Sequence, residues 1–167
     1  MAIRDILQGS NPRLRRVARP VREISGHIQG IVDDMIETLA NAEGVGLAAP
    51  QVGINRRIVV VQIGEDAPIV LINPEIVSTE GSEQRLEGCL SFPGQWGEVV
   101  RPERVVVRAL DRDGGEHTYT GEGLLAQAFA HELDHLDGVL FVDKVVSWVS
   151  EDDLRSQDKE AEGAARE

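Results

Sequence analysis

The amino-acid sequence predicts one α+β domain, and three observations favour it. The chain has 167 residues, of which 41% are hydrophobic, and this size and composition suit a single core. Two pairs of segments with the composition of strands lie in the middle of the chain. One segment with helical spacing precedes these pairs, and another follows them. Strands grouped together with helices at either end are typical of α+β domains, whereas α/β domains alternate the two.

The first part of the chain predicts a helix. Asn11 and Pro12 resemble a helix cap followed by a proline in the first turn, and they open a short basic stretch. Ser25 is placed to cap a longer helix, which Gly44 is expected to end. Apolar residues follow helical spacing in between, at Ile28, Ile31, Val32, Met35, Ile36 and Leu39. The stretch GVGLAAPQVG that comes next is expected to be irregular, because its glycines and proline break either period.

The middle of the chain predicts two strand pairs. Residues 56–63 and 68–77 form the first pair, joined by the turn GEDA. Residues 101–111 and 116–121 form the second, joined by a hairpin turn in DRDGG. The stretch RLEGCLSFPG lies between the pairs and is expected to be a glycine-flanked turn.

The last part of the chain predicts a helix over 121–138 that ends at Gly138, then a short strand or extended segment over 139–144. The apolar pattern fades from Ser150 onward. The tail that begins there holds three basic and seven acidic residues: Arg155, Lys159 and Arg166 against Glu151, Asp152, Asp153, Asp158, Glu160, Glu162 and Glu167. We therefore expect a catalytic domain over 1–149 and an acidic tail over 150–167 that is a frayed helix or disordered.

Charge and cysteine content limit the classes of function. The chain has 17 Lys and Arg against 29 Asp and Glu, a net charge of −12, which argues against a DNA-binding or other nucleic-acid groove. Brief contact with a ribosome stays open. One cysteine permits no internal disulfide, the charged N-terminus does not resemble a signal peptide, and no apolar run reaches the ~20 residues of a membrane span. These features predict a cytoplasmic protein that does not enter membranes.

The second helix carries the clearest chemical motif, His131-Glu132-Leu-Asp-His135. Residues four apart share a helix face. Two neighbouring stripes are otherwise apolar and are expected to be buried: Leu124, Ala128, His131 and His135, then Leu125, Phe129, Glu132 and Leu136. A third stripe is expected to face solvent: Gln127, Ala130, Asp134 and Asp137. Two imidazoles at this spacing can bind one metal ion while the glutamate reaches a metal-bound water, so the motif predicts a metal-dependent hydrolase.

The third metal ligand is open on spacing alone. Cys89 is the leading candidate, because a Cys–His–His set leaves a fourth position for water, as a catalytic metal requires. The alternative is that this thiol is a small buried hydrophobe, the common fate of a lone cysteine. Three other possible donors, Asp134, Asp137 and Asp143, have no familiar spacing from the motif. Of the two remaining histidines, His117 lies in a polar hairpin and His27 at a helix start.

Three motifs in order, GVGLAAPQ at 44–51, EGCLS at 87–91 and HELDH at 131–135, resemble those of the peptide deformylases. The resemblance covers roughly residues 1–148 and leaves the acidic tail outside. It implies an α+β fold in which β-sheets pack around a central helix that carries HExxH. It also implies an enzyme that removes the N-formyl group from the initiating methionine of new polypeptides and releases formate.

The resemblance also implies a role for individual residues. Cys89, His131 and His135 would hold one divalent metal, natively iron(II), which nickel, cobalt or zinc can replace. Glu132 would be the general base and acid, and Gln51 with the Leu90 backbone amide would donate to the oxyanion. Substrate contacts are expected from Gly46, Leu124 and Ala128, and a supporting ionic network from Glu43, Glu87 and Arg101. N-formylmethionyl peptides are the expected partners, transient ribosome contact is possible, and a monomer is expected.

The sequence departs from parts of the family at two places. Trp96 lies near the position where some members have a substrate-contacting arginine, and Gln127 stands where some have an apolar pocket residue.

Three other functions fit parts of the sequence less well. A HExxH metalloendopeptidase shares the helix but does not explain GVGLAAPQ or EGCLS. Dinucleotide binding through GVGLAA requires a strand before the motif and a helix after it, which this context lacks. A structural zinc site takes a fourth protein ligand and needs no buried glutamate.

Overall fold

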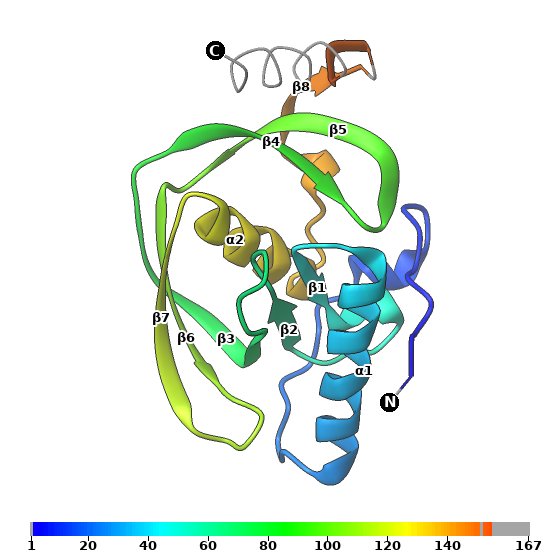
Figure 1. Ribbon diagram of the computed structural model, residues 1–167, viewed down its shortest axis with the longest axis vertical. Helices are drawn as coiled ribbons and strands as arrows, with labels where there is room; N and C mark the ends of the chain where they lie inside the picture. The colour runs from blue at the N-terminus through cyan, green and yellow to red at the C-terminus, as the bar shows by residue number, and fades with distance from the viewer. Residues whose placement is uncertain (1, 151, 155–167) are drawn as a thin grey trace.

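The computed structural model describes residues 2–150 and 152–154, and it confirms the predicted α+β class (Figure 1). The helices are α1 (Gly26–Ala42) and α2 (Leu124–Leu136), with short 3₁₀ helices η1 (Pro12–Arg15), η2 (Ala49–Val52) and η3 (Phe141–Asp143). The strands are β1 (Gly46–Ala48), β2 (Ile58–Val61), β3 (Ile69–Glu80), β4 (Glu83–Cys89), β5 (Phe92–Arg101), β6 (Arg104–Leu110), β7 (Glu116–Glu122) and β8 (Val145–Val149).

The strands form two antiparallel sheets. The larger sheet has the order β1-β2-β3-β6-β7, and the smaller has the order β4-β5-β8. Figure 1 shows α2 between the strands of the two sheets, with β4 and β5 on one side and the larger sheet on the other. This arrangement confirms the expected central helix and places its residues where both sheets can cover them.

The larger sheet is covered by a helix on each face near β2. Successive side chains of a strand point to opposite faces. Val59 accordingly packs in the cluster that contains Phe129 of α2, while Val60 packs in the cluster that contains Met35 of α1. All residues of β2 are buried, which explains why its sequence, IVVV, is apolar throughout instead of alternating.

A third apolar cluster lies under the smaller sheet. Its buried members are Leu14, Phe92, Val99, Leu140 and Phe141. The Phe92 and Phe141 rings meet edge to face with centroids 5.6 Å apart. This cluster joins η1, β5 and η3 and fixes the smaller sheet against the side of α2 that the larger sheet leaves open.

Several local predictions were wrong. The stretch 44–53 is ordered as β1 and η2, because Gly46–Ala48 pairs with the edge of β2. The stretch around Cys89 contains strands β4 and β5, which the glycines and charges in their sequence concealed. Helix α1 ends one residue earlier than expected, with Glu43 in the left-handed conformation at φ 56°.

Beyond α2, half of the predicted extended segment 139–144 is the 3₁₀ helix η3, and the strand follows it as β8, which pairs with β5. The structure describes a short helical piece at residues 152–154, whereas residues 151 and 155–167, most of the predicted acidic tail, lie outside the described residues. Within the described part of the chain, no helix combines the length and the apolar character that crossing a membrane requires.

Candidate metal centre and active site

Helix α2 carries the two histidines and the glutamate of the HExxH motif into the interior. His131, Glu132 and His135 are 7%, 4% and 1% exposed. The expected burial of these three side chains is confirmed. The prediction that the opposite stripe faces solvent was wrong for Gln127 and Ala130, which are also buried. The physical reason is that the smaller sheet covers this face of α2, although the sequence of α2 marks the face as polar.

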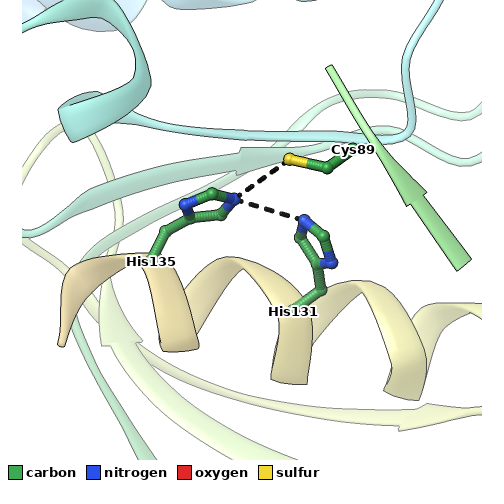
Figure 2. Close-up of side chains that lie close together, drawn as sticks. All are labelled: Cys89, His131 and His135. Atoms are coloured by element: carbon green, nitrogen blue, oxygen red, sulfur yellow. Dashed lines mark hydrogen bonds between the residues drawn. The ribbon is translucent and has the colours of Figure 1, made fainter. Parts of the chain in front are cut away.

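Cys89 meets the two histidines from the end of β4, as Figure 2 shows. The Cys89 Sγ lies 3.4 Å from His135 Nε2, and His135 Nε2 lies 3.2 Å from His131 Nε2. The possible ligand atoms of Cys89, His131 and His135, which we call the ligand group, lie within 4.8 Å of one another. Since the thiol and the imidazoles come from separate elements, only the packing of β4 on α2 brings them together.

These distances fit a metal ion. Metal–nitrogen bonds of ~2.0–2.1 Å and metal–sulfur bonds of ~2.3 Å at tetrahedral angles separate the ligand atoms by ~3.3–3.6 Å. The Cys89–His135 and His135–His131 separations are close to these values. The donor set also leaves one tetrahedral position free of protein, as a catalytic metal requires.

Of the other possible ligands considered above, the structure brings none into this group. Asp134 and Asp143 form ion pairs with arginines, and Asp137 pairs with Arg57. His117 is exposed beside Asp111, and His27 lies at the exposed start of α1.

A buried ionic network contacts Nδ1 of His131. The Glu87 Oε2 lies 2.8 Å from His131 Nδ1, which leaves Nε2 directed at the ligand group. Arg101 donates two hydrogen bonds to Glu87, at 3.0 and 2.7 Å. Burial alone would raise the pKa of Glu87, but the hydrogen bonds from His131 and Arg101 lower it to about 2. Glu87 is therefore a carboxylate, and it fixes the orientation of the His131 ring.

The other partner of Arg101 differs from the expectation. Arg101 Nη1 donates to Asp134 at 2.7 Å, and Lys144 Nζ lies 2.9 Å from the same carboxylate. Glu43, expected in this network, is instead exposed at the end of α1 and lines the cleft described below. Asp134 carries no sequence signal for this role, because it lies on α2 and its partner is 33 residues away on β5 of the smaller sheet.

Glu132 lies beside the ligand group with a free oxygen. Its Oε1 is 3.8 Å from His131 Nε2, and its Oε2 is buried without a hydrogen-bond partner. Burial raises the pKa of Glu132 to about 7, despite the opposing effect of the positive charge on His131. A carboxylate with such a pKa can both accept and return a proton near neutral pH.

Gly46 in β1 permits this placement of Glu132. A Cβ on Gly46 would lie 2.7 Å from both Cγ and Oε1 of Glu132. Any side chain at this position would push Glu132 away, so the glycine of GVGLAAPQ is needed for close approach.

Gln51 of η2 lies next to Cys89. Its Oε1 accepts from Ala48 N at 2.9 Å, while its Nε2 donates to Ser91 Oγ at 3.1 Å and lies 3.6 Å from Cys89 Sγ. These contacts fix the amide with its donor side toward the ligand group. Ser91 was not recognised in the sequence as part of the site. Leu90 lies in the two-residue turn between β4 and β5, and none of the hydrogen bonds among the described residues uses its N–H.

A cleft of about 450 Å³ opens over this group. Ala128 and Glu132 of α2 lie along it together with Gly46 and Leu90. Leu124 also lines the cleft but is 45% exposed, so the prediction that it is buried was wrong, because it is the first residue of α2 and faces the open cleft. Trp96 of β5 also lines the cleft, against Gly88, where an added Cβ would lie 2.6 Å from the indole ring. The expected substrate residues Gly46, Leu124 and Ala128 thus line one cleft with the ligand group.

The comparisons with known proteins agree with this geometry. The family model described as "Polypeptide deformylase" matches residues 3–151. The chain belongs to the peptide deformylase family. A peptide deformylase of Caldanaerobacter subterraneus subsp. tengcongensis is 54% identical over 154 residues, which are 92% of this chain and 96% of that protein. One of Acetivibrio thermocellus is 52% identical over 154 residues, 92% of this chain and 90% of that protein.

Peptide deformylases of known structure share the whole fold. The crystal structure of a peptide deformylase from Legionella pneumophila superposes with a TM-score of 0.84 at 45% identity and covers 99% of each chain. Peptide deformylases are metal-dependent hydrolases that remove the N-formyl group from nascent chains, and this is the activity of the chain. The alternative of a metalloendopeptidase is not favoured.

Proposed function

We propose that Cys89, His131 and His135 hold the metal of this peptide deformylase and that Glu132 carries its proton. The observation that supports this most directly is the approach of one thiol and two imidazole nitrogens to separations of 3.2 and 3.4 Å beside the unpartnered Glu132 carboxylate. Formylated peptide would bind in the cleft above them.

The metal that these ligands hold natively is iron(II) in this proposal, with nickel, cobalt or zinc as substitutes. A thiolate with two imidazoles suits iron(II) and zinc. A divalent cation bound here would polarise the formyl carbonyl and lower the pKa of water toward ~7.

Glu132 performs the proton transfers. Its free Oε2 accepts a proton from the attacking water, and the same group returns this proton to the amine that leaves when the C–N bond breaks. A pKa of about 7 in the absence of metal, caused mainly by burial, is consistent with both transfers. Formate and a free amino terminus are the products.

Gln51 and Leu90 stabilise the negative charge on the formyl oxygen. Both offer N–H donors next to Cys89, one from a side-chain amide fixed by Ala48 and Ser91 and the other from the turn after β4. Donors fixed before the reaction cost no reorganisation when the charge develops, and the loss of one typically lowers the rate by ~10²–10³-fold.

The substrate peptide lies along Gly46, and the methionine side chain contacts Leu124 and Ala128. Gly46 offers a backbone without a side chain next to Glu132. Ala128 is small and buried directly above the helix turn that bears Glu132, so it leaves space for an unbranched side chain. The chain would act as a monomer in the cytoplasm and contact ribosomes only transiently.

Two substrates offered to the same metal-loaded enzyme test this proposal. We expect formate release from a formyl-Met-Ala-Ser peptide and no cleavage of casein, with one metal ion per chain measured by elemental analysis after anaerobic purification. Cleavage of casein without formate release would contradict the assigned activity. Activity at full rate after complete removal of metal would contradict the assigned ligands.

A further inference from the structure

The arginines of this acidic protein divide into two groups. Most basic side chains that the structure describes form an ion pair with a carboxylate: Arg4, Arg15, Arg57, Arg85, Arg101, Arg104, Arg108, Arg112 and Lys144. The others, which we call the arginine patch, are Arg13, Arg16, Arg19, Arg22 and Arg56. All members of the patch are exposed, and none has an ion-pair partner among the described residues. Acidic residues outnumber basic ones 29 to 17, so a shortage of carboxylates does not explain why these arginines have no ion pair.

Most members of the patch are close in sequence, and three of them lie together in space. Four of its members recur at every third residue, from Arg13 to Arg22, on the blue stretch that leads from η1 to α1 in Figure 1. Arg19 and Arg56 form a parallel β-bridge. Together with Arg22 they line a cavity of about 830 Å³, which Glu23 also lines and which shares no residue with the substrate cleft.

Arg13 extends the patch toward η2. A Cβ on Gly53 would lie 2.9 Å from the Arg13 Nη1, so this guanidinium lies over the turn that leads to Arg56. The patch therefore covers the N-terminal segment and the turn between η2 and β2.

The length of the patch identifies the kind of ligand. Residues 16–22 form no helix, Arg19 lies in the β-bridge, and at ~3.3 Å per residue these six steps span at most ~20 Å. A single phosphate or carboxylate reaches only one or two of these guanidinium groups. A linear polyanion with regularly repeated charges can contact the whole row, and guanidinium pairs with phosphate through two parallel hydrogen bonds.

We propose that the arginine patch binds the phosphate backbone of RNA. The patch lacks the apolar centre typical of protein interfaces, since Val17 is its main exposed apolar side chain. RNA is also the nucleic acid present where new polypeptides, the substrates of this family, are made. This inference goes beyond the deformylase reaction, because no patch residue lines the substrate cleft. The net charge of −12 would weaken binding to any polyanion, so contact would be brief and sensitive to salt.

The test compares two variants that lose equal charge. The patch variant carries Arg16→Gln, Arg19→Gln and Arg22→Gln. The control variant carries Arg104→Gln, Arg108→Gln and Arg112→Gln, three surface arginines that are ion-paired in the structure. Binding of a fluorescein-labelled oligouridylate to the full metal-loaded chain is measured by fluorescence anisotropy between ~50 and ~200 mM salt.

We expect the wild type and the control to bind with similar salt dependence. Each lost phosphate contact to single-stranded RNA lowers the slope of log K against log salt by ~0.7, so the patch variant should lose ~2 from this slope. Its deformylase rate and melting temperature should equal those of the wild type, which separates this outcome from a failure of the enzyme's fold or activity.

Three results would overturn the proposal. The first is no detectable binding of oligouridylate by the wild type at the lowest salt. The second is equal loss of binding in the two variants, which would show an effect of net charge alone. The third is competition by polyglutamate as effective as that by RNA of equal charge, which would indicate an acidic protein as the partner.

Discussion

Gly46→Ala tests whether close approach of β1 to α2 positions Glu132, the proposed proton carrier. The new Cβ would lie 2.7 Å from Glu132 Cγ, whereas carbon atoms pack at ~3.5–4.0 Å. Relief of this contact needs a shift of ~1 Å, and Cγ is too near the helix backbone to swing aside freely. Overpacking of a core costs ~1–3 kcal/mol, equivalent to a fall in Tm of ~2–12 °C for a domain of this size. A misplacement of 1 Å at a reacting group can lower kcat by ~10²-fold.

The assay is formate release from a formyl-Met peptide together with a thermal melt and elemental analysis. Gly30→Ala is the matched control, because a Cβ at this position in α1 meets no atom within 4 Å. Replacing a helix-interior glycine by alanine should raise stability by up to ~1 kcal/mol without changing kcat. A Gly46→Ala enzyme with the kcat and Tm of the wild type would refute the reasoning.

Four further predictions concern the site and the tail. Glu132→Gln should retain stoichiometric metal and lose ~10²–10⁴-fold in kcat, since an amide cannot accept the proton; near-normal turnover of the metal-loaded variant would remove this role. Cys89→Ser should bind metal more weakly, and peroxide should inactivate the wild type through an oxidisable thiolate centre; a variant with full metal and activity would make Cys89 a packing residue. Arg101→Leu should lower the free energy of unfolding by ~3–5 kcal/mol, because it removes the arginine that pairs with the buried Glu87 carboxylate, and chemical denaturation would measure this. Deletion from Ser150 onward should leave stability, turnover and ribosome co-sedimentation unchanged, because β8 ends before it, and a large loss of any of them would contradict the assignment of a dispensable tail.

The sequence predicted the elements whose signal is local. The helix with the HExxH motif follows from apolar residues at a period of 3.6, and β2, β3, β6 and β7 follow from β-branched runs bounded by glycine and proline. Strands β4 and β5 were missed because they cover the site from a partly exposed sheet, so charged, polar and glycine residues interrupt their apolar ones. The three-residue strand β1 was missed because it exists only through pairing with β2.

The sequence by itself determined the chemistry that is possible here: two imidazoles and a carboxylate on one helix, one thiol, and a glutamine after a glycine-rich stretch. Only the tertiary structure decided which groups meet. Cys89 and His135 are 46 residues apart, and their contact depends on the packing of the β4–β5 hairpin across α2. The same packing buries Gln127 and raises the pKa of Glu132 through burial. It also pairs Arg101 with Asp134 instead of Glu43. Periodicity reports which face of an element is apolar, but partner choice and pKa depend on which distant groups share that face and how much water they exclude.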